Sequence, residues 1–77
     1  MMKAYILVSL VPGLETNTLS QISSLSGVEE TDLVFGRWDV VVQVKADTIA
    51  NLSRMVVNQM RGLQGVQTTE TLIGSML

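Results

Sequence analysis

A short stretch near the middle of the chain, Gly36-Arg37-Trp38-Asp39, brings together a permissive backbone, a guanidinium, a large aromatic ring and a carboxylate. A carboxylate can hold an ammonium group, while an arginine or free backbone N–H groups can hold a carboxylate. The stretch could therefore recognise a small zwitterion. It could instead be a hairpin connection, in which Gly36 supplies an unusual φ, Asp39 caps the turn and Trp38 covers an edge.

Threonines near the carboxyl end offer a second set of polar groups. Thr68, Thr69 and Thr71 carry hydroxyls that can donate or accept hydrogen bonds. Threonine is also simply a good strand residue, so these positions have the same two interpretations, ligand contact or strand.

Met55 and Met60 are more typical of core filling than of a ligand surface.

The composition excludes most catalytic and metal chemistry. The 77 residues contain no cysteine and no histidine, which removes the usual nucleophile, general base and transition-metal ligand. The sequence also has no Gly-rich phosphate loop, no acidic metal-loop spacing and no nucleophile elbow. We therefore expect a protein that is not an enzyme, with no catalytic residues, no metal site and no cofactor.

Charge and hydropathy restrict the partners. The formal net charge is -2, and the five lysines and arginines are scattered singly. Without a basic patch, direct contact with nucleic acid is disfavoured. The apolar run from Ala4 to Val11 ends at Pro12-Gly13, far short of the roughly 18 residues that a membrane span needs. We read it as a strand of a cytoplasmic protein.

The hydrophobic pattern predicts four strands and two helices. Strands are expected from Tyr5 to Val11, over 28–35, over 40–44 and from about Val66 to Ile73. Leu19, Ile22 and Leu25 recur at helical spacing before Gly27. The second helix is expected to begin at an Asp47 N-cap and to have one apolar face, made by Ile49, Leu52, Val56, Met60 and Leu63.

An internal similarity favours one topology. The segment Leu25–Thr31 matches Leu63–Thr69, with leucine, glycine, valine and threonine at equivalent positions. Each segment joins a helix to the next strand, so the halves look like two βαβ units. We therefore predict a single α+β domain over 1–77, with the ferredoxin-like βαββαβ order and a four-stranded antiparallel sheet.

The two expected central strands are apolar on both faces. Ile6 and Val8 alternate with Tyr5 and Leu7 in the first, and the valines of 40–44 occupy both faces of the third. Two helices can cover only one face of the sheet. We therefore expect a second subunit to pack sheet to sheet, as in dimeric α+β barrels.

Given these residues, the chain resembles the effector-binding domain of the Lrp/AsnC regulator family, also called the RAM domain. The resemblance covers nearly the whole chain. It is carried by the Gly36–Asp39 turn leading into Val40–Val44, by the helix after Asp47, by Gly65-Val66 and by the threonines of the last strand.

The resemblance implies a βαββαβ domain that dimerises through its sheets and assembles into octamers or decamers. It further implies amino-acid effectors at the contacts between dimers, and a role in transcriptional or metabolic regulation. Carried over by position, it implies ligand contacts from Gly36, Arg37, Trp38, Asp39, Thr69 and Thr71.

One departure concerns DNA binding. Full-length members carry a helix-turn-helix domain before this module, whereas the first expected strand here starts almost at Met1. We therefore expect a stand-alone homo-oligomer without DNA binding of its own. Three alternatives stay open: a partner subunit that modulates a full-length regulator, a purely structural assembly subunit, and a small dimeric α+β-barrel enzyme. Such enzymes commonly need a histidine, aspartate or tyrosine facing a cavity within the subunit, and Tyr5 is the only aromatic hydroxyl in this chain.

Overall fold

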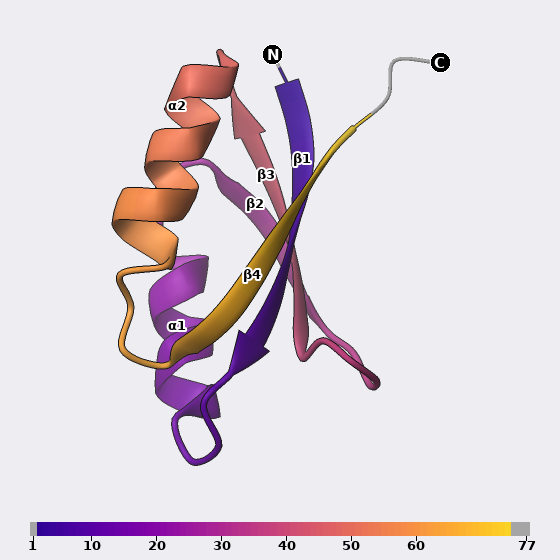
Figure 1. Ribbon diagram of the computed structural model, residues 1–77, viewed down its shortest axis with the longest axis vertical. Coiled ribbons are helices and arrows are strands. Elements are labelled where there is room, and N and C mark those ends of the chain that lie inside the picture. Colours follow the sequence, from indigo (N-terminus) through magenta and orange to yellow (C-terminus); the bar gives the residue numbers. More distant parts are fainter. Residues whose placement is uncertain (1, 75–77) are drawn as a thin grey trace.

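The computed structural model describes residues 2–74 (Figure 1). Along the chain the elements are β1 (Met2–Leu10), α1 (Glu15–Ser23), β2 (Val28–Leu33), β3 (Val40–Ala46), α2 (Ile49–Arg54), its π-helical continuation η1 (Met55–Met60), and β4 (Val66–Ile73). In the described range no helix combines the length and the apolar character needed to cross a membrane.

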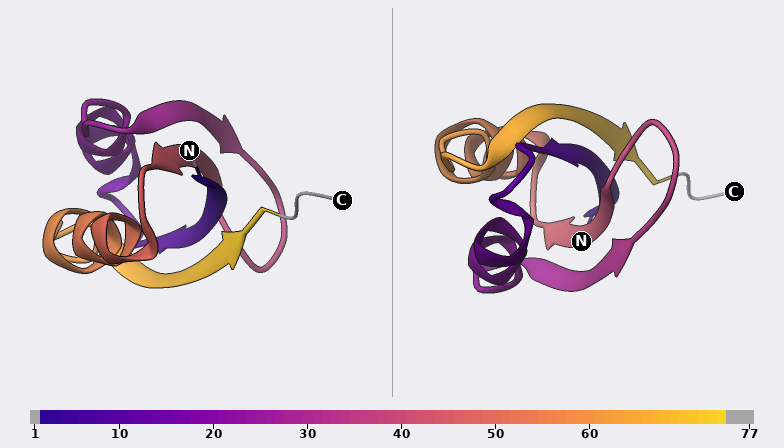
Figure 2. Two further views of the ribbon diagram at one scale, coloured as in Figure 1. Left: turned by 90° about the horizontal axis from the view of Figure 1, so that it is seen from above. Right: turned by 90° about the horizontal axis from the view of Figure 1, so that it is seen from below.

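The predicted βαββαβ fold with a four-stranded antiparallel sheet is confirmed. The strands are arranged in the order β2-β3-β1-β4, and each neighbouring pair is antiparallel. Both helices lie on one side of the sheet: α1 contacts β2, α2 contacts β3, and the η1 end of the second helix lies beside β4 (Figure 2). The edge strands are therefore β2 and β4, and among residues 2–74 no helix lies over the other face of the sheet.

Alternation in the two central strands builds the core. The helix-facing side chains are buried: Ala4, Ile6, Val8 and Leu10 of β1, and Val40, Val42, Val44 and Ala46 of β3. Burial of each larger aliphatic side chain stabilises the fold by about 1.5–3 kcal/mol. On the opposite face, Tyr5, Leu7 and Val41 are half-buried, so both faces of the central strands are apolar as predicted.

The β2–β3 connection begins earlier than predicted, because β2 ends at Leu33 rather than at Phe35. Leu33 pairs with Val40, and beyond that pair the Val34 N–H donates to the Asp39 carbonyl at 3.0 Å. The chain then leaves the sheet, and Phe35 is fully exposed at 106%. The connection forms a loop that projects from the strands (Figure 2).

The second helix begins at a different cap from the one predicted. Thr48, not Asp47, is the N-cap, and its Oγ1 accepts a hydrogen bond from the Asn51 N–H at 3.1 Å. Threonine in the extended conformation places its hydroxyl toward the free N–H groups of the first turn. The predicted apolar face is buried at Leu52 and other positions, but Ile49 is 61% exposed.

The helix widens where η1 begins. The Arg61 N–H donates to the Val56 carbonyl, five residues earlier, at 2.8 Å. This spacing is characteristic of a π-helix, which occurs mostly as single turns. Met55 and Met60 are buried at the two ends of η1 and contribute to the core, as predicted.

The internal similarity corresponds to two equivalent turns. In both Leu25–Val28 and Leu63–Val66, the valine N–H donates to the leucine carbonyl, at 3.2 and 3.1 Å. The glycine carbonyl of each turn accepts from the end of a central strand, from the Lys45 N–H at 3.0 Å and from the Val11 N–H at 2.8 Å. The repeat thus closes each half of the fold in the same way.

Candidate functional site

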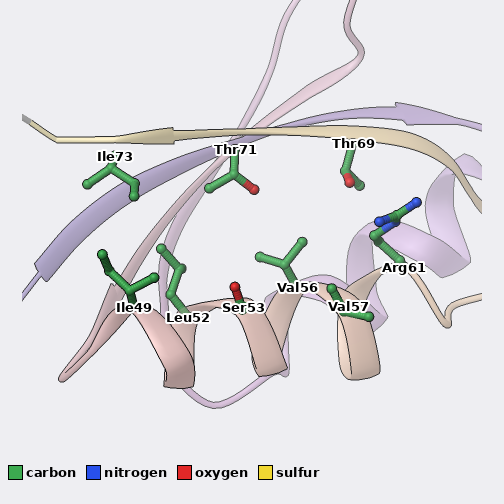
Figure 3. A pocket seen from close by; sticks show the side chains of 9 residues that line it. All are labelled: Ile49, Leu52, Ser53, Val56, Val57, Arg61, Thr69, Thr71 and Ile73. Atoms are coloured by element: carbon green, nitrogen blue, oxygen red, sulfur yellow. The ribbon is translucent and has the colours of Figure 1, made fainter.

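A groove of about 350 Å³ runs between the second helix and β4 (Figure 3). It exists because β4 is an edge strand that the helix covers only in part. The lining side chains are Ile49, Leu52, Ser53, Val56, Val57, Arg61, Thr69, Thr71 and Ile73.

The β-sheet register brings the β4 side chains into the groove. Thr69 pairs with Val8 and Thr71 pairs with Ile6, so both threonines share the helix-facing side of the sheet with these buried residues. Thr68 falls on the opposite face, where its hydroxyl hydrogen-bonds the Ser9 hydroxyl. Thr69 and Thr71 therefore line the groove, whereas Thr68 lies on the opposite face of the sheet.

The groove combines apolar walls with three side-chain hydroxyls. Ser53, Thr69 and Thr71 present their side chains toward the space between helix and strand (Figure 3). Within residues 2–74, none of these three hydroxyls has a hydrogen-bond partner. Such groups can hold the polar part of a small ligand while the aliphatic walls cover its hydrocarbon part.

Asp39 is fixed to the end of β1 by backbone contacts. Its N–H donates to the Val8 carbonyl at 2.9 Å, and its Oδ2 accepts from the Leu10 N–H at 2.8 Å. The carboxylate thus takes the structural role of holding the connection. Asp39 also lines a second cavity of about 280 Å³, together with Leu10, Glu15, Leu33, Val34 and Phe35.

The rest of the predicted turn lies on the projecting loop. Gly36 is exposed with φ +126°, a conformation that favours glycine. The Arg37 guanidinium lies 5.9 Å from the centre of the Trp38 ring, within range of a cation–π interaction. None of these three residues lines the groove or the second cavity.

Within one chain, the predicted contacts therefore fall in two places. Thr69 and Thr71 share the groove, while the Gly36–Asp39 turn lies at the β3 side of β1, on the other side of that strand from β4. The sequence interpretation missed Ser53 and Arg61. Their signal is a stripe with four-residue spacing, Ile49, Ser53, Val57 and Arg61, next to the buried positions of the same helix.

Tyr5, the only aromatic hydroxyl available to an enzymatic alternative, lies on the face of the sheet opposite to the helices. It pairs with Gln43 of β3 and with Leu72 of β4. It lines neither the groove nor the second cavity.

Comparison with known proteins adds a family and a fold. Residues 3–74 match the family described as the Lrp/AsnC ligand binding domain. An uncharacterised helix-turn-helix-type transcriptional regulator of Pyrococcus horikoshii is 34% identical over 73 residues, 91% of this chain and 49% of that protein. The chain spans about half the length of the curated relatives that it matches.

Solved structures show the same architecture. A protein from Thermus thermophilus has a TM-score of 0.93 and 27% identity, and the match covers 100% of this chain and 96% of that one. A transcriptional regulator from Neisseria meningitidis, solved as a complex with L-Met, has a TM-score of 0.90. It is 17% identical, and the match covers 96% of this chain and 49% of that one, so it supports the fold alone.

Proposed function

This chain belongs to the Lrp/AsnC ligand-binding domain family, and from that membership we propose that it is an oligomeric module that binds an amino-acid effector in transcriptional or metabolic regulation. The observation that carries the proposal is the groove beside β4, where the Thr69 and Thr71 hydroxyls lie among aliphatic side chains and have no hydrogen-bond partner within residues 2–74. The neisserial regulator, which has the same fold, was solved with L-Met, and we propose the same class of ligand for this chain.

The groove supplies one half of the proposed site. A zwitterion needs a partner for its ammonium group, and none of the residues that line the groove is acidic. We propose that the Gly36–Asp39 turn of another protomer completes the site. One carboxylate oxygen of Asp39 accepts from Leu10, which leaves the other for an ammonium group.

The face of the sheet without helices is the proposed dimer interface. Tyr5, Leu7 and Val41 are half-buried there, and Leu72 at the β4 edge is 46% exposed. A second copy packed against this face would remove these side chains from water, which contributes about 25 cal/mol per Å² of apolar area. Assembly of such dimers into larger rings would bring turns and grooves of different protomers together.

A partner-subunit role is the second candidate. The chain corresponds to about half of the HTH-type regulators that it matches, so it could join their ligand-binding halves in mixed assemblies. In that case the same sheet face would serve as the contact. We propose no DNA contact by residues 3–74 themselves, because their family match is to a ligand-binding domain.

The test is a screen of the twenty common amino acids by thermal shift, followed by calorimetry of any that raises Tm. We expect at least one to bind at millimolar concentration or below. Thr69→Val, which keeps the shape and removes the hydroxyl, should weaken binding by about 5- to 10-fold, as expected for loss of a hydrogen bond worth about 1 kcal/mol. Failure of every amino acid to bind would exclude the effector function and leave the partner-subunit role.

Thr31→Val is the matched control for that substitution. Thr31 is the equivalent of Thr69 in the internal repeat, and it lies on the helix-facing side of the opposite edge strand, where it pairs with Val42. It does not line the groove. We expect Thr31→Val to leave ligand affinity unchanged, whereas an equal effect of both variants would mean that the groove is not the site.

A further inference from the structure

We infer that Arg61 is the carboxylate-binding residue of the groove and that the ligand is therefore an aliphatic amino acid bound in one direction, with its carboxylate at Arg61. This inference rests on the proposed effector function and adds a residue and a ligand class to it. The observation behind it is the order of chemical groups along the groove. Arg61 and Thr69 lie at one end, Ile49 and Ile73 at the other, and Ser53 and Thr71 between them (Figure 3).

The π-helical turn places Arg61 at its end of the groove. Because the Arg61 N–H bonds the Val56 carbonyl five residues back, Arg61 lies directly after Val56 along the helix surface. Both residues line the groove. The Arg61 side chain extends from the end of η1 toward Thr69 on the opposite wall (Figure 3). Arg61 therefore borders the space between helix and strand at the Thr69 end of the groove.

The Arg61 guanidinium is also without a partner among the residues that the structure describes. Within residues 2–74 it has no hydrogen-bond or ion-pair partner, whereas Arg54 Nη1 donates to Asn51 Oδ1 at 3.3 Å and Arg37 lies over Trp38. A guanidinium presents its donors in a planar fork that matches a carboxylate. Val56, which is buried, and Val57, which is 53% exposed, also line the groove.

The other end of the groove selects the side chain of the ligand. Ile49 is 61% exposed and Ile73 is 52% exposed, and they face each other across the opening (Figure 3). No lining residue at this end carries a charge. An aliphatic side chain placed there would cover both isoleucines. Each methylene buried in this way raises the affinity about 4-fold. A charged side chain would lose its hydration without gaining a partner.

The experiment is calorimetry on the full chain with L-leucine, L-isoleucine, L-methionine and L-valine, and with L-leucinamide, which lacks the carboxylate. We expect the wild-type protein to bind at least one of the four acids, and Arg61→Gln to weaken that binding at least 10-fold. L-leucinamide should bind weakly to the wild type and with the same affinity to Arg61→Gln. Only direct contact between Arg61 and the carboxylate predicts this difference between acid and amide.

Arg54→Gln is the matched control, because Arg54 lies on the same helix and does not line the groove. It should bind the four acids as the wild type does. Light scattering and melting curves on both variants check assembly and folding, because an arginine at a helix C-terminus can also act by stabilising the helix. Equal loss of acid and amide binding in Arg61→Gln would assign Arg61 that structural role and overturn the inference.

Two further outcomes separate this inference from the proposed function. If the wild type binds an amino acid and Arg61→Gln binds it equally well, the effector function stands and the role of Arg61 is wrong. Preference for an acidic or basic amino acid would likewise overturn the aliphatic assignment alone. If none of the twenty amino acids binds, both fail together.

Discussion

The side-chain Oδ2 of Asp39 accepts a hydrogen bond from the backbone N–H of Leu10 at 2.8 Å. The bond joins the last residue of β1 to the residue just before β3, and the Asp39 N–H returns a second bond to the Val8 carbonyl at 2.9 Å. Together they fix the base of the loop that carries Gly36 and Trp38. Asp39, which is proposed to bind the ammonium group of the ligand, thus also stabilises the connection between β1 and β3. Two substitutions can separate these roles.

Asp39→Ala should lower the free energy of unfolding by about 1–3 kcal/mol, because the part-buried Leu10 N–H loses its acceptor. Asp39→Asn keeps an oxygen in that position, so we expect most of the stability to return. If the second carboxylate oxygen holds an ammonium group, both variants should lose roughly 10-fold or more in amino-acid affinity. Urea unfolding followed by circular dichroism, with calorimetry on the folded proteins, measures both. Full ligand affinity in Asp39→Asn would contradict the ligand role.

The fold could be predicted because its signals are local or repeated. The valines of 40–44 alternate in burial as a strand should, and the two leucine-glycine-valine turns bond identically. The site could be predicted only in part. Whether Thr68 or Thr69 faces the helices depends on the register with β1, which is a long-range property. The four-residue stripe of the second helix does include Arg61, but it does not indicate the π-helical bond from the Arg61 N–H to the Val56 carbonyl.

The cap of the second helix gives a direct comparison of adjacent residues. Thr48→Ala should lower stability by about 1 kcal/mol, because the hydroxyl that accepts from the Asn51 N–H is lost. Asp47→Ala should have an effect within about 0.5 kcal/mol, as is usual for an exposed position outside such a contact. Chemical denaturation of the two variants side by side makes the comparison. A larger loss in Asp47→Ala would assign the cap to the residue predicted from the sequence.

Gly65→Ala should destabilise the fold by about 1–3 kcal/mol through overpacking. Gly65 is buried, and a methyl group there would overlap the side chain of Thr18, which is also buried. Shortening that neighbour should relieve part of the clash, so the double variant Gly65→Ala with Thr18→Ala should be more stable than the sum of the single losses predicts. Thermal melts of the three variants test this. Strict additivity would mean that the two sites do not meet.

Two substitutions on the central strands distinguish the two faces of the sheet. Leu7 of β1 is half-buried on the face without helices, whereas Val42 of β3 is fully buried beneath them, paired with Ile6. The same new charge should therefore have opposite consequences. Val42→Asp places an unpaired carboxylate in the core. The free-energy cost of burying it is comparable to much of a small domain's free energy of unfolding, so the variant should unfold.

Leu7→Asp should instead preserve the fold and prevent the sheet-to-sheet contact. Light scattering at micromolar concentration should give the wild type the mass of a dimer or larger assembly and Leu7→Asp the mass of one chain, with unchanged circular dichroism. Ser20→Asp adds the same charge on the exposed side of α1 and should assemble as the wild type does. A monomeric wild type would remove the basis for the dimer. A Leu7→Asp protein that still assembles would mean that the subunits meet through another surface, because a carboxylate at the centre of two apposed sheets would be desolvated without a partner.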